Sequence, residues 1–358
     1  MPIFDQGYQH WNGTLSGHAW RWLAITRRGV QIGLKGRAVR RVLLFAWLPA
    51  LVLATVLCLW GLLERGSDLV AAFAPQIEQT LAGLGFHDPA ILTDPSTYRV
   101  EIWTLCYSYF MATQLSLAMI LILLVGPNLI SQDLRYNALP LYFSRPLRRI
   151  DYFLGKLGII AAFLGMAIIA PSLFAYALGL LFSLDVTIVR DTFGLLLAVA
   201  AYGLVISLSA GLLILALSSL SRNSRYVALF WLALWLVTST VSGILQSVHY
   251  QQQMFEARQV GQSDEQYLAE QIREAESDWR PLISYTANLS RVGRQLLGTD
   301  AAWQRLSQTQ PGEQMSVSLL QRMGPQHPWQ WSAAVLAGLC GLSACILNYS
   351  IKSLDRLK

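Results

Sequence analysis

The residues best suited to bind a partner lie in one basic and aromatic stretch, "LYFSRPLRRIDYFLGK", residues 141–156. Its charged residues are mostly cations and include a single acid: Arg145, Arg148, Arg149, Lys156 and Asp151. Aromatic rings and guanidinium groups are the side chains that most often anchor protein interfaces. The stretch therefore predicts a docking surface, and a basic loop that anchors the chain to the membrane is the alternative.

No catalytic motif accompanies this stretch. Gly155-Lys156 resembles the end of a phosphate-binding loop, but Ile150 stands where the first glycine should be and Leu157 where the hydroxyl residue should be. The 5 histidines and 4 cysteines show no metal-ligand or disulfide spacing. We therefore expect no catalytic residue, cofactor or metal on this chain, and no ATP hydrolysis by the chain alone.

A second group of polar side chains falls inside apolar stretches. Gln114 lies in one, and Thr238 and Ser242 lie one helical turn apart in another. Polar groups at membrane depth must find partners or line a wet cavity, and a primary amide has up to about four hydrogen-bonding sites to satisfy. We predict that these side chains contact a transported substrate or its water, and interhelical hydrogen bonding is the alternative.

The elements that must position these residues are membrane-spanning helices. Hydrophobic residues make up 54% of the chain and charged residues 13%, which is too apolar for a soluble surface. Apolar runs without Asp, Glu, Lys or Arg, each long enough to cross a bilayer, cover residues 42–62, 104–126, 157–182, 193–217, 226–246 and 329–351. The sequence predicts an all-α polytopic membrane protein with six transmembrane helices.

Charge distribution predicts the orientation of these helices. If the N-terminus is cytoplasmic, the inner segments hold 17 of the 27 Lys and Arg residues and only 4 of the 21 acids. Lys and Arg accumulate in cytoplasmic loops, so both termini are predicted to be cytoplasmic, in the cell (inner) membrane. The net charge of +6 is then explained by topology, and a nucleic-acid partner is not expected.

The chain divides into four predicted parts. Residues 1–41 form a basic N-terminal arm, in which the spacing of Arg21, Arg28 and Lys35 favours an amphipathic helix on the inner membrane surface. An irregular basic arm that holds anionic lipid is the alternative. Spans one to five follow in 42–246 and enclose the cytoplasmic connector 127–156.

The remaining two parts are an outer segment and the last span. Residues 247–328 form an extracytoplasmic segment with two predicted helical stretches, the second around 283–306, and together these suggest a small outer helical subdomain. Residues 329–358 contain span six and a cytoplasmic tail.

The connector resembles that of the ABC-2 (type-2 ATP-binding-cassette exporter) permease family. The family motif is similar to "D-L-R-x-x-A-L-x-L-Y-x-S-R-P-x-x-R-x-x-Y-x-x-G-K". Its positions correspond here to Asp133, Leu134, Arg135, Ala138, Leu139, Leu141, Tyr142, Ser144, Arg145, Pro146, Arg149, Tyr152, Gly155 and Lys156. The order of the six apolar runs extends the resemblance over most of the chain.

The resemblance implies the permease subunit of an exporter. A coupling helix in the connector would dock into a separate ATPase subunit, which would hold ATP and Mg. A second permease chain, identical or related, would complete the transporter, with spans two and five lining the cavity between the chains. The residues implied in coupling are Asp133, Leu134, Arg135, Tyr142, Arg145, Pro146, Arg149 and Lys156.

The long N-terminal arm and the outer segment 247–328 depart from the simplest family members. They leave the substrate open, since family members export drugs, peptides, lipids, glycans or ions, or serve cofactor assembly. The alternative function is a non-transport membrane scaffold that presents 247–328 outside.

Overall fold

Within the part of the chain that the structure describes, six helices are long and apolar enough to cross a membrane, as the sequence predicts. The computed structural model describes residues 20–66, 94–138, 148–183, 187–260, 277–308 and 326–355, with a few isolated positions between them. The candidate spans are Arg37–Glu64, Arg99–Arg135, Arg149–Ser183, Thr187–Leu220, Ser224–Gln253 and Trp329–Ser350. The expectation of an all-α polytopic membrane protein is confirmed.

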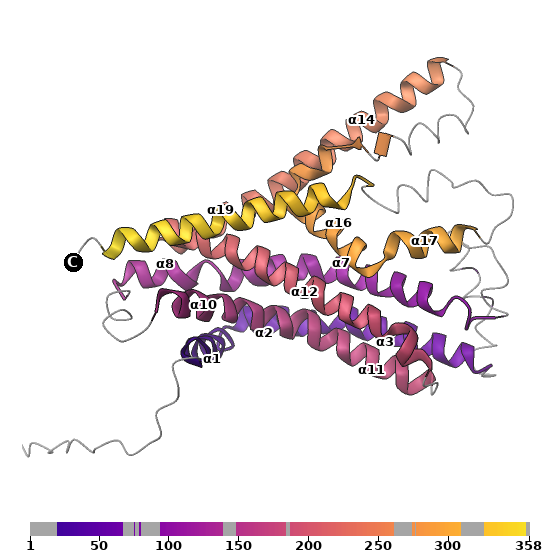
Figure 1. Ribbon diagram of the computed structural model, residues 1–358, viewed down its shortest axis with the longest axis horizontal. Coiled ribbons are helices and arrows are strands. Elements are labelled where there is room, and N and C mark those ends of the chain that lie inside the picture. The colour runs from indigo at the N-terminus through magenta and orange to yellow at the C-terminus, as the bar shows by residue number, and fades with distance from the viewer. Residues whose placement is uncertain are drawn as a thin grey trace, which may run out of the picture.

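Several spans are built from more than one helical element (Figure 1). Span one comprises α2 (Arg37–Phe45) and α3 (Trp47–Glu64), and span two comprises α7 (Arg99–Val125), which leads into α8 (Asn128–Arg135). Span three comprises α10 (Arg149–Leu164), η2 (Gly165–Ile169) and α11 (Ala170–Ser183). Span four is α12 (Thr187–Leu220), span five comprises α13 (Ser224–Leu232), η3 (Ala233–Val237) and α14 (Thr238–Val260), and span six is α19 (Trp329–Asp355).

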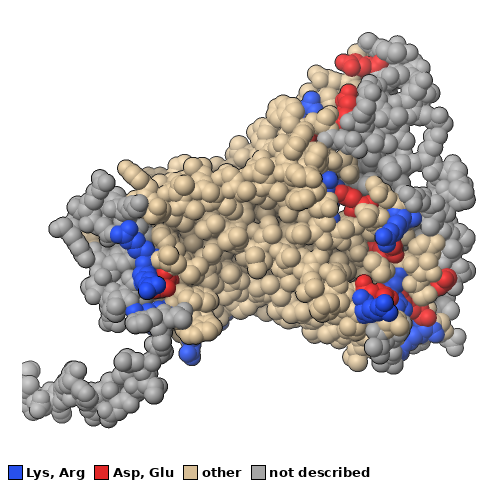
Figure 2. Space-filling view, viewed as in Figure 1, with Lys and Arg blue, Asp and Glu red and all other residues tan. Residues whose placement is uncertain are grey.

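The two ends of the bundle differ in charge. Figure 1 shows α8, α1 and the C-terminal end of α19 at the same end. On the face seen in Figure 2, Lys and Arg gather at that end, a broad belt has no charged side chains, and acidic and basic residues mix at the opposite end. The α8 end is therefore the predicted cytoplasmic side. It carries α8, which belongs to the connector, and the connection between spans four and five with Arg222 and Arg225.

Span two forms the centre of the bundle. Its side chains Trp103, Tyr107 and Met111 are fully buried. In the most apolar stretch of span two, 56% of the residues are buried within the chain. The corresponding share is 17% in span five and 22% in span six. Spans five and six therefore leave most of their surface to lipid or to another chain.

The N-terminal helix α1 (Arg21–Gly33) packs tightly against α10. A Cβ at Gly29 would overlap Ile159, and a Cβ at Gly155 would overlap Ile25 and crowd the carbonyl of Trp22. The hydroxyl of Thr26 donates to the carbonyl of Gly155 at 3.0 Å. The helix predicted in the N-terminal arm is present, and glycines on both helices allow its close approach to span three.

The second helical stretch of the segment 247–328 does not stand apart from the spans. It forms η4 (Arg280–Ile283), α16 (Tyr285–Leu297) and α17 (Thr299–Gln308), and α16 packs on α12 and α19. The Tyr285 hydroxyl lies 3.0 Å from the Ser209 hydroxyl of α12. The apolar stripe of α16 is covered by spans, with Leu289 fully buried, which is why no separate subdomain core is needed here. The first helical stretch of this segment lies outside the described residues.

Candidate coupling site

The helix α8 lies at the end of span two and leans against span four. Its apolar side chains face inward: Ile130 is buried, and Leu129 and Leu134 pack partly against the core. At the junction with α7, a Cβ on Gly126 would overlap the Ile214 side chain of α12. A glycine is needed at this position because the chain passes so close to α12.

One hydroxyl on span four caps the N-terminus of α8. Ser218 Oγ accepts hydrogen bonds from the N–H groups of Ile130 at 3.1 Å and Ser131 at 2.9 Å. The same hydroxyl donates to the carbonyl of Pro127 at 2.9 Å, and Ser218 is fully buried. The first N–H groups of a helix lack partners within the helix, so α12 supplies the cap that α8 does not provide for itself.

A buried ion pair fastens α8 to span three. Lys156 Nζ on α10 lies 2.7 Å from Asp133 Oδ2 on α8 and donates to the Leu129 carbonyl at 2.6 Å. The hydroxyl of Tyr152 donates to the same Asp133 oxygen at 2.7 Å, and Lys156 Nζ lies 5.3 Å from the Tyr152 ring centroid. Lys156 is only 7% exposed. Breaking one side of a buried pair leaves an uncompensated charge and is strongly destabilising, so this contact fixes α8 against α10.

The other predicted coupling residues occupy the surface or lie outside the described residues. Arg135 is exposed, with its guanidinium 5.7 Å from the Tyr136 ring centroid. Arg149 is the first residue of α10, next to the N-cap Arg148, whose N–H donates to Asp151. Tyr142, Arg145 and Pro146 lie outside the described residues. The structure thus brings Asp133 and Lys156 together and leaves Arg135 open to a partner.

The predicted pathway residues bond to separate partners instead of gathering at one site. Gln114 is fully buried, and its Nε2 donates to the Ala46 carbonyl at the α2–α3 junction at 2.7 Å. The hydroxyl of Ser242 donates to the Arg280 carbonyl at 3.0 Å, and the hydroxyl of Thr238 donates to the Leu234 carbonyl within span five. For Gln114 and Ser242, these contacts match the alternative of interhelical hydrogen bonding.

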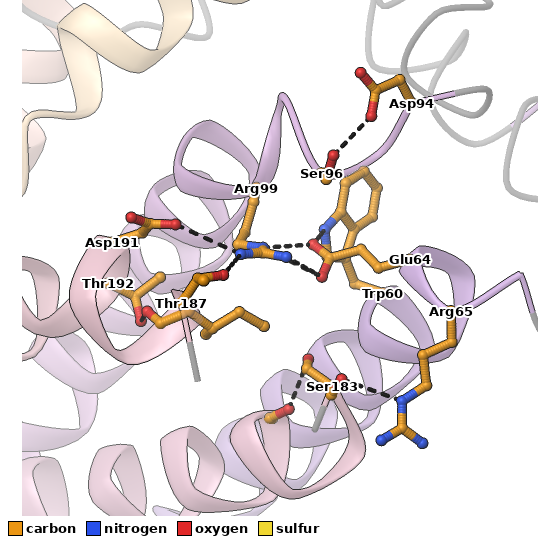
Figure 3. Close-up of polar contacts among 12 residues, drawn as sticks. Trp60, Glu64, Arg65, Asp94, Ser96, Arg99, Ser183, Thr187, Asp191 and Thr192 are labelled. Carbon is orange, nitrogen blue, oxygen red and sulfur yellow. Dashed lines mark hydrogen bonds and ion pairs between the residues drawn. The ribbon is translucent and has the colours of Figure 1, made fainter. Parts of the chain in front are cut away.

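At the other end of the bundle, a buried ion pair joins spans one, two and four. Arg99 on α7 donates to both carboxylate oxygens of Glu64 on α3, with distances of 3.0–3.2 Å. Its Nη1 reaches Thr187 at 3.1 Å and Asp191 at 3.5 Å on α12, and Trp60 donates to Glu64 at 2.9 Å (Figure 3). The sequence analysis did not predict this site. The available signal was a pair of opposite charges, with Glu64 just after the first apolar run and Arg99 just before the second.

A second polar cluster holds α16 to the start of span six. Arg291 pairs with Asp300 at 2.8 Å and donates to the His327 carbonyl at 2.6 Å. His327 Nε2 lies 2.7 Å from the Ser332 hydroxyl. Burial, with the added positive charges of Arg291 and Arg294, lowers the pKa of His327 to about 4, so the imidazole stays neutral at pH 7.

These features define a multi-pass membrane protein, because six of the described helices are long and apolar enough to cross a membrane and pack into one bundle. A family model described as "ABC-2 family transporter protein" matches residues 39–323. The chain therefore belongs to the ABC-2 transporter family, and the resemblance drawn from the connector is confirmed. None of the curated proteins matches it.

Proposed function

We propose that this chain is the permease subunit of an ABC exporter in the cell (inner) membrane. A separate ATPase subunit binds ATP and Mg, and it docks on α8 and the connector around it. A second permease chain, identical or related, completes the transporter. The family membership supports the role of transport subunit.

The observation that carries the coupling proposal is the double attachment of α8. Ser218 holds its N-terminus to span four, and the Asp133–Lys156 pair holds it to span three. An element held by buried hydrogen bonds and an ion pair moves with its neighbours, because separating them leaves polar groups without partners. A push by the ATPase on α8 therefore displaces spans two, three and four together.

The substrate path is proposed to lie between the two permease chains. Most of span five is not buried within one chain, and its α14 part, which carries Thr238 and Ser242, leaves a surface for that cavity. The contribution of Gln114, Thr238 and Ser242 to the path stays a prediction, because each already has a hydrogen-bonding partner in the single chain.

Copurification with the ATPase tests this function. The double variant Arg145→Glu/Arg149→Glu places acids where the dock needs cations, and we expect the ATPase to be lost from the purified complex. The matched control Arg40→Glu/Arg41→Glu makes the same charge change on α2, on exposed residues away from α8, and is expected to retain the ATPase.

The outcomes separate transport from a scaffold function. Undiminished copurification in the Arg145→Glu/Arg149→Glu variant contradicts docking through the connector. Failure of the wild-type chain to retain any ATPase, with no ATP-dependent transport, favours the non-transport scaffold that presents 247–328 outside. Unchanged melting temperatures show that neither variant acts through misfolding.

A further inference from the structure

A surface pocket of about 470 Å³ lies at the α8 end of the bundle. Its lining comes from the end of α8 and from the connection between spans four and five: Arg135, Arg222, Asn223, Ser224 and Arg225. The cations come from segments nearly 90 residues apart, so only the fold brings them together. Among the described residues none that lines the pocket is acidic, so this lining carries a net positive formal charge.

The cations of this pocket are available for a ligand. Within the part of the chain that the structure describes, neither Arg135, Arg222 nor Arg225 forms an ion pair. The nearby acid Asp133 is already bound by Lys156 and Tyr152. Guanidinium groups bind phosphate with bidentate hydrogen bonds, and the first turn of α13 adds partial positive charge at the same place.

An exposed apolar surface adjoins the pocket. Tyr226, Leu229 and Phe230 lie on one face of α13, directly after Arg225, and Leu220 precedes the loop at the end of α12; all are between 58% and 63% exposed. A free inorganic anion has no apolar part that could contact this surface. A phospholipid carries both a phosphate and apolar acyl chains. Basic pockets beside transmembrane helices on the cytoplasmic side suit anionic headgroups.

We propose that this pocket binds the phosphate of an anionic phospholipid from the leaflet on the α8 side. The arginines hold the phosphate, and the acyl chains run along the exposed face of α13. On a two-fold axis an identical second permease chain would bring the same arginines against each other, so a contact across the axis at this pocket is unfavourable. The proposal rests on membrane insertion. Arg135 also belongs to the proposed ATPase dock, so the test changes only Arg222 and Arg225.

Lipid binding to the detergent-purified full chain tests this site. Short-chain phosphatidylglycerol and phosphatidylcholine are titrated separately, and bound lipids are counted by native mass spectrometry. We expect the variant Arg222→Gln/Arg225→Gln to bind phosphatidylglycerol roughly tenfold or more weakly, since each surface cation contributes about 1 kcal/mol. Its phosphatidylcholine binding should not change, and Arg222→Lys/Arg225→Lys should retain most of the affinity.

The control variant Arg40→Gln/Arg41→Gln removes the same charge from the same end of the bundle, outside the pocket. An equal loss of phosphatidylglycerol in this control would overturn the proposal, because general attraction would then explain binding. Displacement of the lipid by equimolar inorganic phosphate would show a site for small anions only. Unchanged lipid binding in Arg222→Gln/Arg225→Gln, with loss of the ATPase from the complex, would assign the pocket to protein docking.

Discussion

Gln114 is a residue for which burial decides between two hypotheses. Its side chain is fully buried, and its amide nitrogen joins span two to the α2–α3 junction through the Ala46 carbonyl. Its Oε1 finds no partner among the described residues. An amide in this setting favours a role in holding helices together, although contact with substrate between two chains stays a prediction.

The substitution Gln114→Leu distinguishes these roles. It removes the donor to a buried carbonyl, and we expect the chain to lose about 1–3 kcal/mol of stability, seen as a lower melting temperature in detergent. Gln246→Leu is the matched control, because Gln246 is half-buried and, among the residues that the structure describes, bonds only to Ser242 on its own helix. A stable Gln114→Leu protein with an altered substrate response of ATP turnover would instead place Gln114 in the pathway.

At the scale of elements, α8 depends on helices that are distant in the sequence. Ser218 supplies a cap from span four, and Lys156 supplies a counter-charge from span three. The short α8 has only eight residues, and isolated helices of this length are not stable in water. Its position is therefore set by its contacts with spans three and four. A force that a partner exerts on α8 would act on those spans through the same contacts.

The substitution Ser218→Ala tests this dependence. It leaves two buried N–H groups without their partner, while the Pro127 carbonyl keeps its bond from the Ser131 hydroxyl. We therefore expect a loss of roughly 2–3 kcal/mol and faster hydrogen exchange in residues 127–135. Ser207→Ala is the control on the same helix, because in the described part of the chain its hydroxyl bonds only to the Gly203 carbonyl. Equal exchange in α8 for both variants would show that the cap does not hold this helix.

At the scale of the whole molecule, the charge asymmetry predicts which end faces the cytoplasm. Figure 1 shows α8 at the same end of the bundle as the connection between α12 and α13. Ser96, between spans one and two, and Ser277, between spans five and six, are exposed and belong to segments predicted to lie on the opposite side of the membrane. The distribution of Lys and Arg predicts that the α8 end faces the cytoplasm.

Cysteine labelling of intact cells tests this orientation. In a chain with its native cysteines replaced, we expect cysteines at Ser96 and Ser277 to react with an impermeant thiol reagent. A cysteine at Ser221 should react only after permeabilisation. Labelling of Ser221 in intact cells would reverse the topology.

The sequence alone predicted the membrane spans, the family and the N-terminal helix. Apolar runs such as 104–126 predicted the spans because a bilayer requires a continuous apolar helix of about 20 residues, and this requirement is local. The connector motif predicted the family, because its residues are adjacent in the sequence. The N-terminal helix was also predicted, although Gly29 and Gly33 weaken a helix considered alone.

Tertiary structure decided how these helices meet. Gly29 and Gly155 serve a close packing of α1 on α10, and Ser218 caps a helix almost 90 residues away. Likewise, α16 packs among the spans, and Arg99 pairs with Glu64. Hydrophobic periodicity in the sequence predicts only that a helix has an apolar face that must be buried. Which helix covers that face, and which buried polar groups then need each other, follows from the complete packing of the bundle.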